Sequence, residues 1–136
     1  MSALSRPLPQ MSPESLPFWD GCREGKLLLQ YCDHCGKINW FPRAFCFSCT
    51  GAAFTWRPAR GNGILETYST VHRAMSEAWE AEIPYTLAIV MLTEGIRMVT
   101  RLLPHPGREP KVDAPVRVRF VSVGGGLQLP FFEEVD

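Results

Sequence analysis

Four of the five cysteines in the sequence form two pairs with the same spacing. Cys32 and Cys35 make one Cys-x2-Cys pair, and Cys46 and Cys49 make a second pair after ten intervening residues. Two thiolates three positions apart on a tight turn can face one metal ion, and two such turns complete a tetrahedral site with four sulfur ligands. Because four thiolates leave no open coordination position, the spacing predicts a structural Zn²⁺ site, with iron as the alternative occupant of the same geometry.

Two other interpretations of the paired cysteines stay open, namely two disulfides or a redox-active Cys-x2-Cys motif. The duplication of the motif favours a metal site over either of them. His34 lies inside the first pair, and with four thiolates available we expect it to face solvent. Cys22 lies outside both pairs on an apolar helical segment, where a free cysteine behaves as a small hydrophobic residue.

The segments that must position these cysteines belong to a small globular chain. With 136 residues, 46% hydrophobic and 21% charged, the chain has room for one ordinary domain or two small modules. Its 11 glycines and 12 prolines favour short strands and turns over long helices. The fold class that we expect is therefore mainly β.

The sequence predicts three parts. Residues 1–25 form a flexible, proline-rich leader and a helical arm that begins at Ser12-Pro13 and stops at Gly25. Residues 26–53 form a zinc ribbon, with short strands on either side of the first cysteine pair. Residues 54–136 form a five-stranded barrel of the OB-fold type, with strands expected at 54–75 (bent at Gly61-Asn62-Gly63), 85–92, 96–103, 116–123 and 127–132.

The charge distribution argues against binding to polyanions. The chain carries 14 basic and 14 acidic side chains, and residues 64–136, which form most of the expected barrel, carry seven basic and ten acidic ones. An OB-fold barrel that binds single strands needs a basic groove with stacking aromatic residues. A nucleic-acid-binding module is therefore kept only as the alternative function. Eleven arginines against three lysines would suit a phosphorylated ligand, although genomic composition explains the same ratio.

The sequence contains no recognisable catalytic constellation. His72 and His105 have no nucleophile motif near them, and Glu77, Glu80 and Glu82 fit a solvated loop better than a catalytic pair. We therefore do not expect this chain to be an enzyme on its own. No apolar run approaches the roughly 20 residues of a membrane span, and the first residues lack the apolar core of a signal peptide, so we expect a cytoplasmic protein.

Two groups of apolar residues are candidates for contacts with another molecule. Leu16, Phe18 and Trp19 give the helical arm a dense apolar face that we expect a partner chain to cover, with packing on its own ribbon as the rival explanation. Trp79 lies in a polar loop over residues 73–84, which in an OB-fold barrel shares one end with the loop over residues 124–126. Trp79 is either a loop anchor or a contact for a partner or ligand.

Short motifs spread over nearly the whole chain, from about Leu16 to Phe132, resemble one family. They are Pro17-Phe18-Trp19-Asp20-Gly21, Arg23-Glu24-Gly25-Lys26-Leu27, the two cysteine pairs with Phe41-Pro42-Arg43 between them, Gly61-x-Gly63, Tyr68-Ser69, Pro84-Tyr85 and Ala114-Pro115-Val116-Arg117-Val118. The combination resembles the zinc-ribbon plus OB-fold accessory proteins filed as the domain of unknown function numbered thirty-five. This resemblance implies an N-terminal helical arm, a rubredoxin-like ribbon and a C-terminal OB-fold barrel.

The resemblance also implies a function. Proteins of that family stand beside thiolase-like enzymes, or beside hydratases or aldolases that act on acyl-CoA thioesters, as required subunits that can help to hold CoA. The expected function is therefore a non-catalytic accessory subunit of an acyl-CoA-processing enzyme. The resemblance does not identify residues that contact CoA, and from charge and location we select Arg43, His72, Arg73 and Trp79 as candidates.

Overall fold

The computed structural model describes residues 7–135 and shows a mainly β protein with one short N-terminal helix. This confirms the fold class predicted from the sequence. The elements are η1 (Pro13–Ser15), α1 (Leu16–Arg23), β1 (Leu28–Cys32), β2 (Ile38–Asn39), β3 (Phe54–Pro58), β4 (Asn62–Val71), η2 (Glu77–Trp79), β5 (Tyr85–Leu92), β6 (Arg97–Leu102), β7 (Pro115–Gly124) and β8 (Leu127–Glu134).

The helical arm starts and stops where the sequence signals place its ends. The backbone N–H of Ser12 donates to Ser15 Oγ at 3.0 Å, and Pro13 follows at the first position of η1, where a missing N–H costs nothing. Gly25 lies directly after the helix with φ +76°, a conformation that a residue without Cβ adopts freely. The chain can therefore turn sharply from α1 into β1.

The first sheet contains the strands of the ribbon in the order β2-β1-β3, all antiparallel. We predicted one long strand from Phe54 to Met75, and this prediction is wrong, because the segment forms two strands in different sheets. Residues of β3 pair with β1, whereas β4 opens the barrel. The separation occurs at Gly61, whose φ of +82° redirects the chain between the two sheets.

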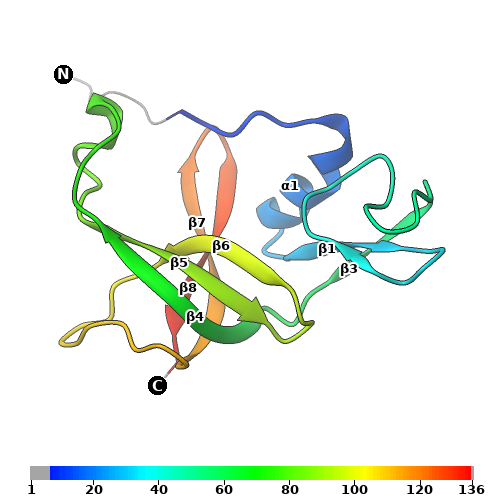
Figure 1. Cartoon of the computed structure of the whole chain (residues 1–136). Helices are drawn as coiled ribbons and strands as arrows, with labels where there is room; N and C mark the ends of the chain where they lie inside the picture. Colours follow the sequence, from blue (N-terminus) through cyan, green and yellow to red (C-terminus); the bar gives the residue numbers. More distant parts are fainter. Residues whose placement is uncertain (1–6, 136) are drawn as a thin grey trace.

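The second sheet closes into a barrel in the order β4-β5-β6-β8-β7, which Figure 1 shows below and beside the ribbon. The four strands predicted after residue 84 are confirmed to within a few residues. Gly63 allows the close approach of β4 to β5, because a Cβ at this position would lie 2.2 Å from the carbonyl oxygen of Met91. The β6–β8 contact that completes the barrel is the only parallel one among the described strands, and it has a single register pair, Leu102 with Phe132.

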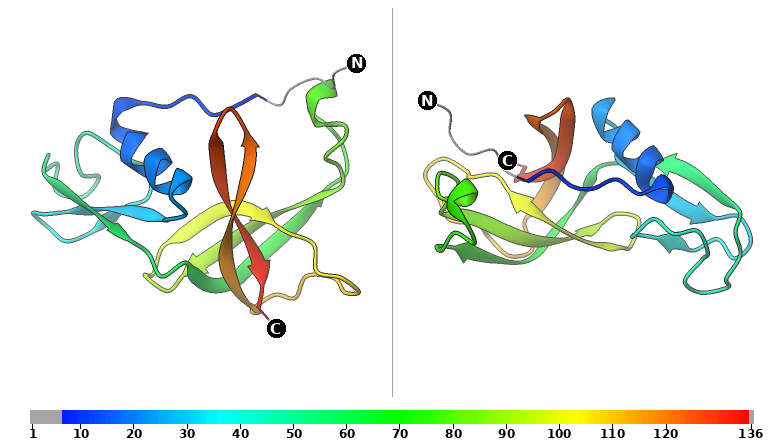
Figure 2. Two further views of the ribbon diagram at one scale, coloured as in Figure 1. Left: turned by 180° about the vertical axis from the view of Figure 1, so that it is seen from behind. Right: turned by 90° about the horizontal axis from the view of Figure 1, so that it is seen from above.

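Helix α1 lies between the ribbon sheet and the β7–β8 hairpin, as Figures 1 and 2 show from three directions. Its buried residues Phe18 and Cys22 belong to the same apolar cluster as Leu29 of the ribbon and Phe132 of the barrel. The side-chain amide of Gln128 also donates to the carbonyl oxygen of Arg23 at 3.0 Å. The ribbon and the barrel therefore share one continuous core through α1.

The extended residues before the helix cross the molecule on the barrel side. From Pro7 to Ser12 the chain runs from the side of η2 past the tip of the β7–β8 hairpin towards α1, as both views of Figure 2 show. Within residues 7–135, no helix has the length and apolar character needed to cross a bilayer.

Candidate metal centre and barrel cleft

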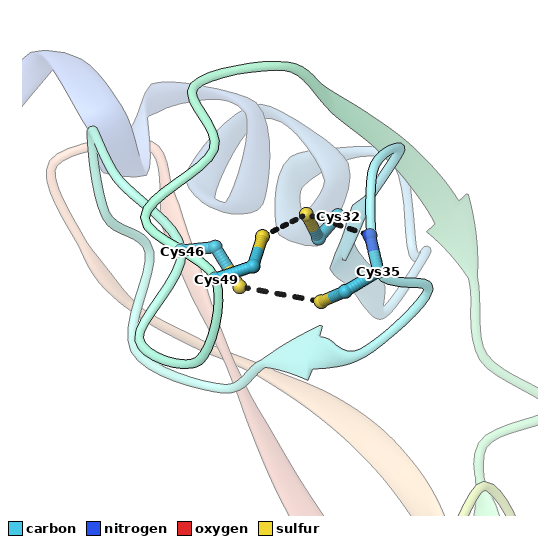
Figure 3. A group of neighbouring side chains, drawn as sticks. All are labelled: Cys32, Cys35, Cys46 and Cys49. Carbon is cyan, nitrogen blue, oxygen red and sulfur yellow. Dashed lines mark hydrogen bonds between the residues drawn. The ribbon is translucent and has the colours of Figure 1, made fainter.

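The four paired cysteines converge on one point between two tight turns, as Figure 3 shows. Cys32 ends β1, Cys35 lies in the turn that follows, and Cys46 and Cys49 lie in the second turn. Their Sγ atoms all lie within 4.8 Å of one another, with Cys32 and Cys49 3.5 Å apart and Cys35 and Cys46 3.6 Å apart. All four are free thiols in the structure, so neither pair forms a disulfide in it.

This arrangement fits a metal ion held by four thiolates. A tetrahedral site with metal–sulfur bonds of about 2.3 Å needs sulfur atoms about 3.8 Å apart, close to the separations found here. Backbone N–H groups of Cys35, Ser48 and Gly51 each donate to a sulfur at 3.4 Å, and such donors stabilise the thiolate form. At Cys46, backbone hydrogen bonds, chiefly from Cys49, lower the thiol pKa to about 6. At Cys49, a hydrogen bond from the Gly51 N–H lowers the thiol pKa, but burial and the neighbouring thiols outweigh it and raise the pKa to about 11. The ribbon can therefore bind a metal through these four cysteines.

Two buried amide side chains hold the loop that leads into the second turn. Gln30 of β1 makes two hydrogen bonds with the backbone of Arg43, donating to its carbonyl oxygen at 2.9 Å and accepting from its N–H at 3.0 Å. Asn39 of β2 accepts from the N–H of Phe47 at 2.9 Å and directs its amide nitrogen at Cys46 Sγ, 3.5 Å away. The sequence analysis missed both, although a polar residue at an inward-facing strand position is a usable signal.

The two other residues considered near the cysteine motifs have the places expected for them. Cys22 lies on the buried face of α1, fully enclosed in the core, and burial raises the pKa of its thiol to about 11. It therefore behaves as a small apolar residue with a protonated sulfur. His34 is exposed in the first turn.

A second feature is an apolar cleft in the barrel wall, on the side where β6 and β8 diverge beyond their single register pair. It consists of two adjoining cavities of about 250 Å³ and 290 Å³. Both cavities are lined by Val99 and Thr100 of β6 and by Leu129 and Phe131 of β8. We refer to these two cavities together as the barrel cleft.

The first cavity of the barrel cleft lies beside the η2 loop. Trp79 and Val123 both line it, so the loop after β4 meets the end of the β7–β8 hairpin as predicted. The guanidinium of Arg101 lies 4.2 Å from the centre of the Tyr85 ring and 5.5 Å from that of Phe131. Nη1 of Arg101 also forms an ion pair with Glu82 at 2.8 Å, whereas its Nη2 is buried and has no hydrogen-bond partner among the described residues.

The second cavity lies where α1, the ribbon loop and the barrel meet. Its walls are mainly aromatic rings and prolines, namely Phe18, Trp19, Trp40, Phe41, Pro42, Pro130 and Phe131. The Phe18 ring packs edge to face against Trp19 and Trp40, with centroid separations of 5.0 Å and 5.8 Å. These contacts fix the aromatic wall of the cavity.

The residues selected for contact with CoA or a partner are spread over the molecule. Of the four CoA candidates, Trp79 alone lines the barrel cleft, whereas His72 and Arg73 are exposed after β4 and Arg43 is exposed on the ribbon loop. In the arm, Phe18 is buried within its own chain, so the docking prediction now depends on the exposed surface of Leu16 and the half-buried Trp19. The sequence analysis did not select Tyr85, Arg101 and Phe131, which come together from three strands.

Family models match both parts of this architecture. The model described as "ChsH2, rubredoxin-like zinc ribbon domain" matches residues 19–55, and the one described as "ChsH2, C-terminal OB-fold domain" matches residues 56–121. The chain belongs to the ChsH2 (DUF35) family. This membership confirms the resemblance found in the sequence and agrees with the four-cysteine ribbon and the closed barrel described above.

Two curated proteins are relatives of this ChsH2-family chain. One is "Probable enoyl-CoA hydratase alpha subunit" of Thermomonospora curvata, 29% identical over 129 residues, which are 93% of this chain and 39% of the relative. The other is "DUF35 domain-containing scaffold protein" of Methanocaldococcus jannaschii, 33% identical over 73 residues, which are 53% of this chain and 51% of the relative. The matched residues thus span about two fifths of the length of the first relative and about half of that of the second.

Two solved structures have the same fold. The structure described as "Ltp2-ChsH2(DUF35) aldolase" matches with a TM-score of 0.83 and 26% identity, covering 93% of this chain and 98% of the other. A DUF35-family protein of unknown function from Sulfolobus solfataricus matches with a TM-score of 0.60 and 14% identity, covering 90% and 86% of the two chains. The second likeness concerns the fold alone.

Proposed function

We propose that this chain is a non-catalytic accessory subunit of an acyl-CoA-processing enzyme. The observation that carries the proposal is the match to the chain in "Ltp2-ChsH2(DUF35) aldolase", which extends over 98% of that chain and whose description pairs a DUF35 protein with Ltp2. The Thermomonospora relative, described as an enoyl-CoA hydratase subunit, supports the same class of enzyme. The partner that we expect is a thiolase-like enzyme, or a related hydratase or aldolase.

In this role the metal would be structural Zn²⁺. Cys32, Cys35, Cys46 and Cys49 would hold it, and four thiolates leave no position for a substrate. The ion would keep the two turns of the ribbon together and so hold the loop over residues 41–47 beside the barrel cleft. Free thiols in this number suit a reducing compartment, which supports a cytoplasmic location.

The contribution to the reaction would be positioning. The exposed Arg73 would pair with a phosphate of CoA, and Trp79, at the mouth of the barrel cleft, would offer a ring for stacking on adenine. Arg43 and His72 are the remaining candidates for this contact. Holding a large substrate in the reactive geometry can lower a barrier by several kcal/mol without chemistry from the chain that holds it.

Reconstitution tests the proposal. Turnover of an acyl-CoA thioester is measured for the partner enzyme alone, for this chain alone and for the mixture, and the mixture is repeated with Trp79→Ala and Arg73→Ala. Arg60→Ala is the matched control, because Arg60 is also exposed but lies between the ribbon and the barrel, away from Trp79. We expect turnover only in the mixture, a raised KM in the two variants and no change in the control.

Each part of the proposal has its own contrary result. Full turnover by the partner alone would contradict the accessory role, and turnover by this chain alone would make it an enzyme. Unchanged kinetics in both variants would exclude Arg73 and Trp79 as the CoA contact.

A further inference from the structure

The barrel cleft is open because of one residue in β8. Phe132 is paired with Leu102 of β6, and the next residue of β8 that faces β6 is Pro130. Proline has no N–H to donate, so the ladder between the two strands cannot continue past it. The carbonyl oxygen of Pro130 instead accepts a hydrogen bond from Thr100 Oγ1 at 2.8 Å. The ladder between β6 and β8 is therefore interrupted at Pro130, whose buried carbonyl oxygen is already hydrogen-bonded.

The edge of β6 offers backbone groups to whatever lies in the cleft. The N–H of Leu92 donates to the carbonyl of Ile96 at 2.8 Å, and in an antiparallel ladder hydrogen-bonded pairs alternate with non-bonded ones. The register between β5 and β6 then directs the N–H and C=O of Val99 and Arg101 away from β5 and towards the cleft. An extended peptide could form backbone hydrogen bonds along this edge.

The side chains of the cleft favour an uncharged, apolar occupant. Val99 is 60% exposed and Phe41 is 70% exposed, so two apolar side chains of the cleft stand in water in the isolated chain. Arg101 is compensated by Glu82, and Arg97, at the start of the same strand, is compensated by Glu66 at 2.8 Å. Both arginines of β6 therefore already have a carboxylate partner, although the buried Nη2 of Arg101 has no hydrogen-bond partner among the described residues.

The chain itself shows what kind of segment fits this surface. Pro7, Leu8 and Pro9 line the first cavity as an extended, exposed stretch, so a proline-flanked apolar segment already borders one half of the cleft. The second cavity shares a wall with the first and is lined by aromatic rings and prolines. Such grooves recognise extended proline-containing peptides, because proline is already ordered before binding and loses little entropy.

We propose that the second cavity of the barrel cleft binds an extended, proline-containing segment of the partner subunit. This proposal rests on the accessory-subunit function proposed above. The segment would lie along β6 with an apolar or proline side chain between Trp40, Phe41 and Val99. The ribbon, the arm and the barrel would then all contact the same partner segment. The core that these three parts share would hold them in the positions that this contact needs.

A peptide-binding experiment tests the cleft in the isolated, zinc-loaded chain. A phage-displayed library of random dodecapeptides is selected on the full chain, and the enriched peptides are synthesised and titrated by fluorescence anisotropy. Val99→Glu places a charge in the cleft, and Ile64→Glu is its matched control, since Ile64 is also a β-branched residue with an exposed side chain in the barrel but lines neither cavity.

We expect the enriched peptides to contain proline beside an apolar residue. Val99→Glu should weaken their binding by about tenfold or more, which corresponds to about 1.4 kcal/mol, while Ile64→Glu should leave it within about twofold. Enrichment of peptides without proline, or equal binding by both variants, would overturn the proposal. Sedimentation that shows a dimer of the isolated chain broken by Val99→Glu would also overturn it, because the occupant would then be a second copy.

A crosslinking experiment separates this proposal from the proposed function. The photoreactive amino acid p-benzoylphenylalanine replaces Val99, or Ile64 as the control, and the chain is irradiated in the reconstituted complex. We expect a crosslink from position 99 to a proline-containing segment of the partner and none from position 64. A complex that turns over but crosslinks equally from both positions would refute the docking site while leaving the accessory function intact. Proline-containing peptides that bind the isolated chain, without a complex that turns over, would contradict the accessory function while leaving the binding site in the second cavity intact.

Discussion

Replacing Asn39 with alanine tests whether the buried amide beside the cysteines controls metal binding. Asn39 is 2% exposed and makes two contacts on the second turn, one with the N–H of Phe47 and one with Cys46 Sγ. The Asn39→Ala variant removes both of these contacts at once. The turn that carries Cys46 and Cys49 would then lose its link to β2.

The structure gives the size of the expected effect. Loss of the acceptor for the Phe47 N–H costs about 1 kcal/mol, at the lower end of the usual range because the Phe47 side chain is exposed and water can reach the turn. A hydrogen bond to a charged thiolate contributes about 1.5–3 kcal/mol, and the 3.5 Å separation from Cys46 Sγ points to the lower end. The sum of about 2–3 kcal/mol corresponds to a 30- to 150-fold loss of affinity, near the upper end of the 10- to 100-fold typical of residues that support a metal ligand.

The assay is competition for Zn²⁺ between the protein and a chromogenic chelator. Asn62→Ala is the matched control, because Asn62 is an exposed residue of β4 whose side chain accepts from Thr93 Oγ1 at 2.7 Å, far from the ribbon turns in the sheet order. We expect its metal affinity to stay within about twofold of the unmodified chain. A Zn²⁺ affinity of Asn39→Ala within about threefold of that of the unmodified chain would refute the reasoning, because the two contacts of Asn39 would then contribute little to metal binding.

Four further results follow from the same structure. Removal of the metal by a chelator should abolish the dispersed NMR signals of the ribbon while the barrel signals persist. Loss of both sets of signals would contradict the expectation that only the ribbon depends on the metal. Cys22, with a pKa near 11 and no exposure, should resist iodoacetamide at pH 8 until urea unfolds the chain, as mass spectrometry can show. Gly63→Ala should lower the free energy of unfolding by about 2–3 kcal/mol in urea titrations, since its Cβ would meet the Met91 carbonyl oxygen, and an unchanged midpoint would mean that the strands can separate there. A hydrogen bond from Arg117 lowers the pKa of Glu133, so the charged carboxylate stabilises the fold at neutral pH. This stabilisation is lost as the pH falls through the lowered pKa. In the Glu133→Gln variant, the free energy of unfolding should therefore depend less on pH on the acid side, as urea titrations at several pH values can show.

The sequence by itself determined the features that depend on neighbours close in the chain. The Cys-x2-Cys spacing predicts the convergence of Cys32, Cys35, Cys46 and Cys49, because each pair needs only one turn to bring two sulfurs together. Likewise the arm beginning at Ser12 and the four strands after residue 84 follow from capping and alternation patterns of a few residues. Such patterns are readable because the interactions behind them are local.

Tertiary structure alone decided the features that need partners distant in the chain. The local sequence of residues 54–58 predicts a strand but not the sheet to which it belongs, and only its pairing with β1 assigns it to the ribbon. The contacts of Asn39 with the second turn and of Arg101 with Tyr85 and Phe131 join residues from different elements. The barrel cleft exists because Pro130 in one strand lies opposite Thr100 in another, about thirty positions away. A period-two pattern states which side of a strand is apolar, but the choice of neighbouring strand depends on the packing of the whole core.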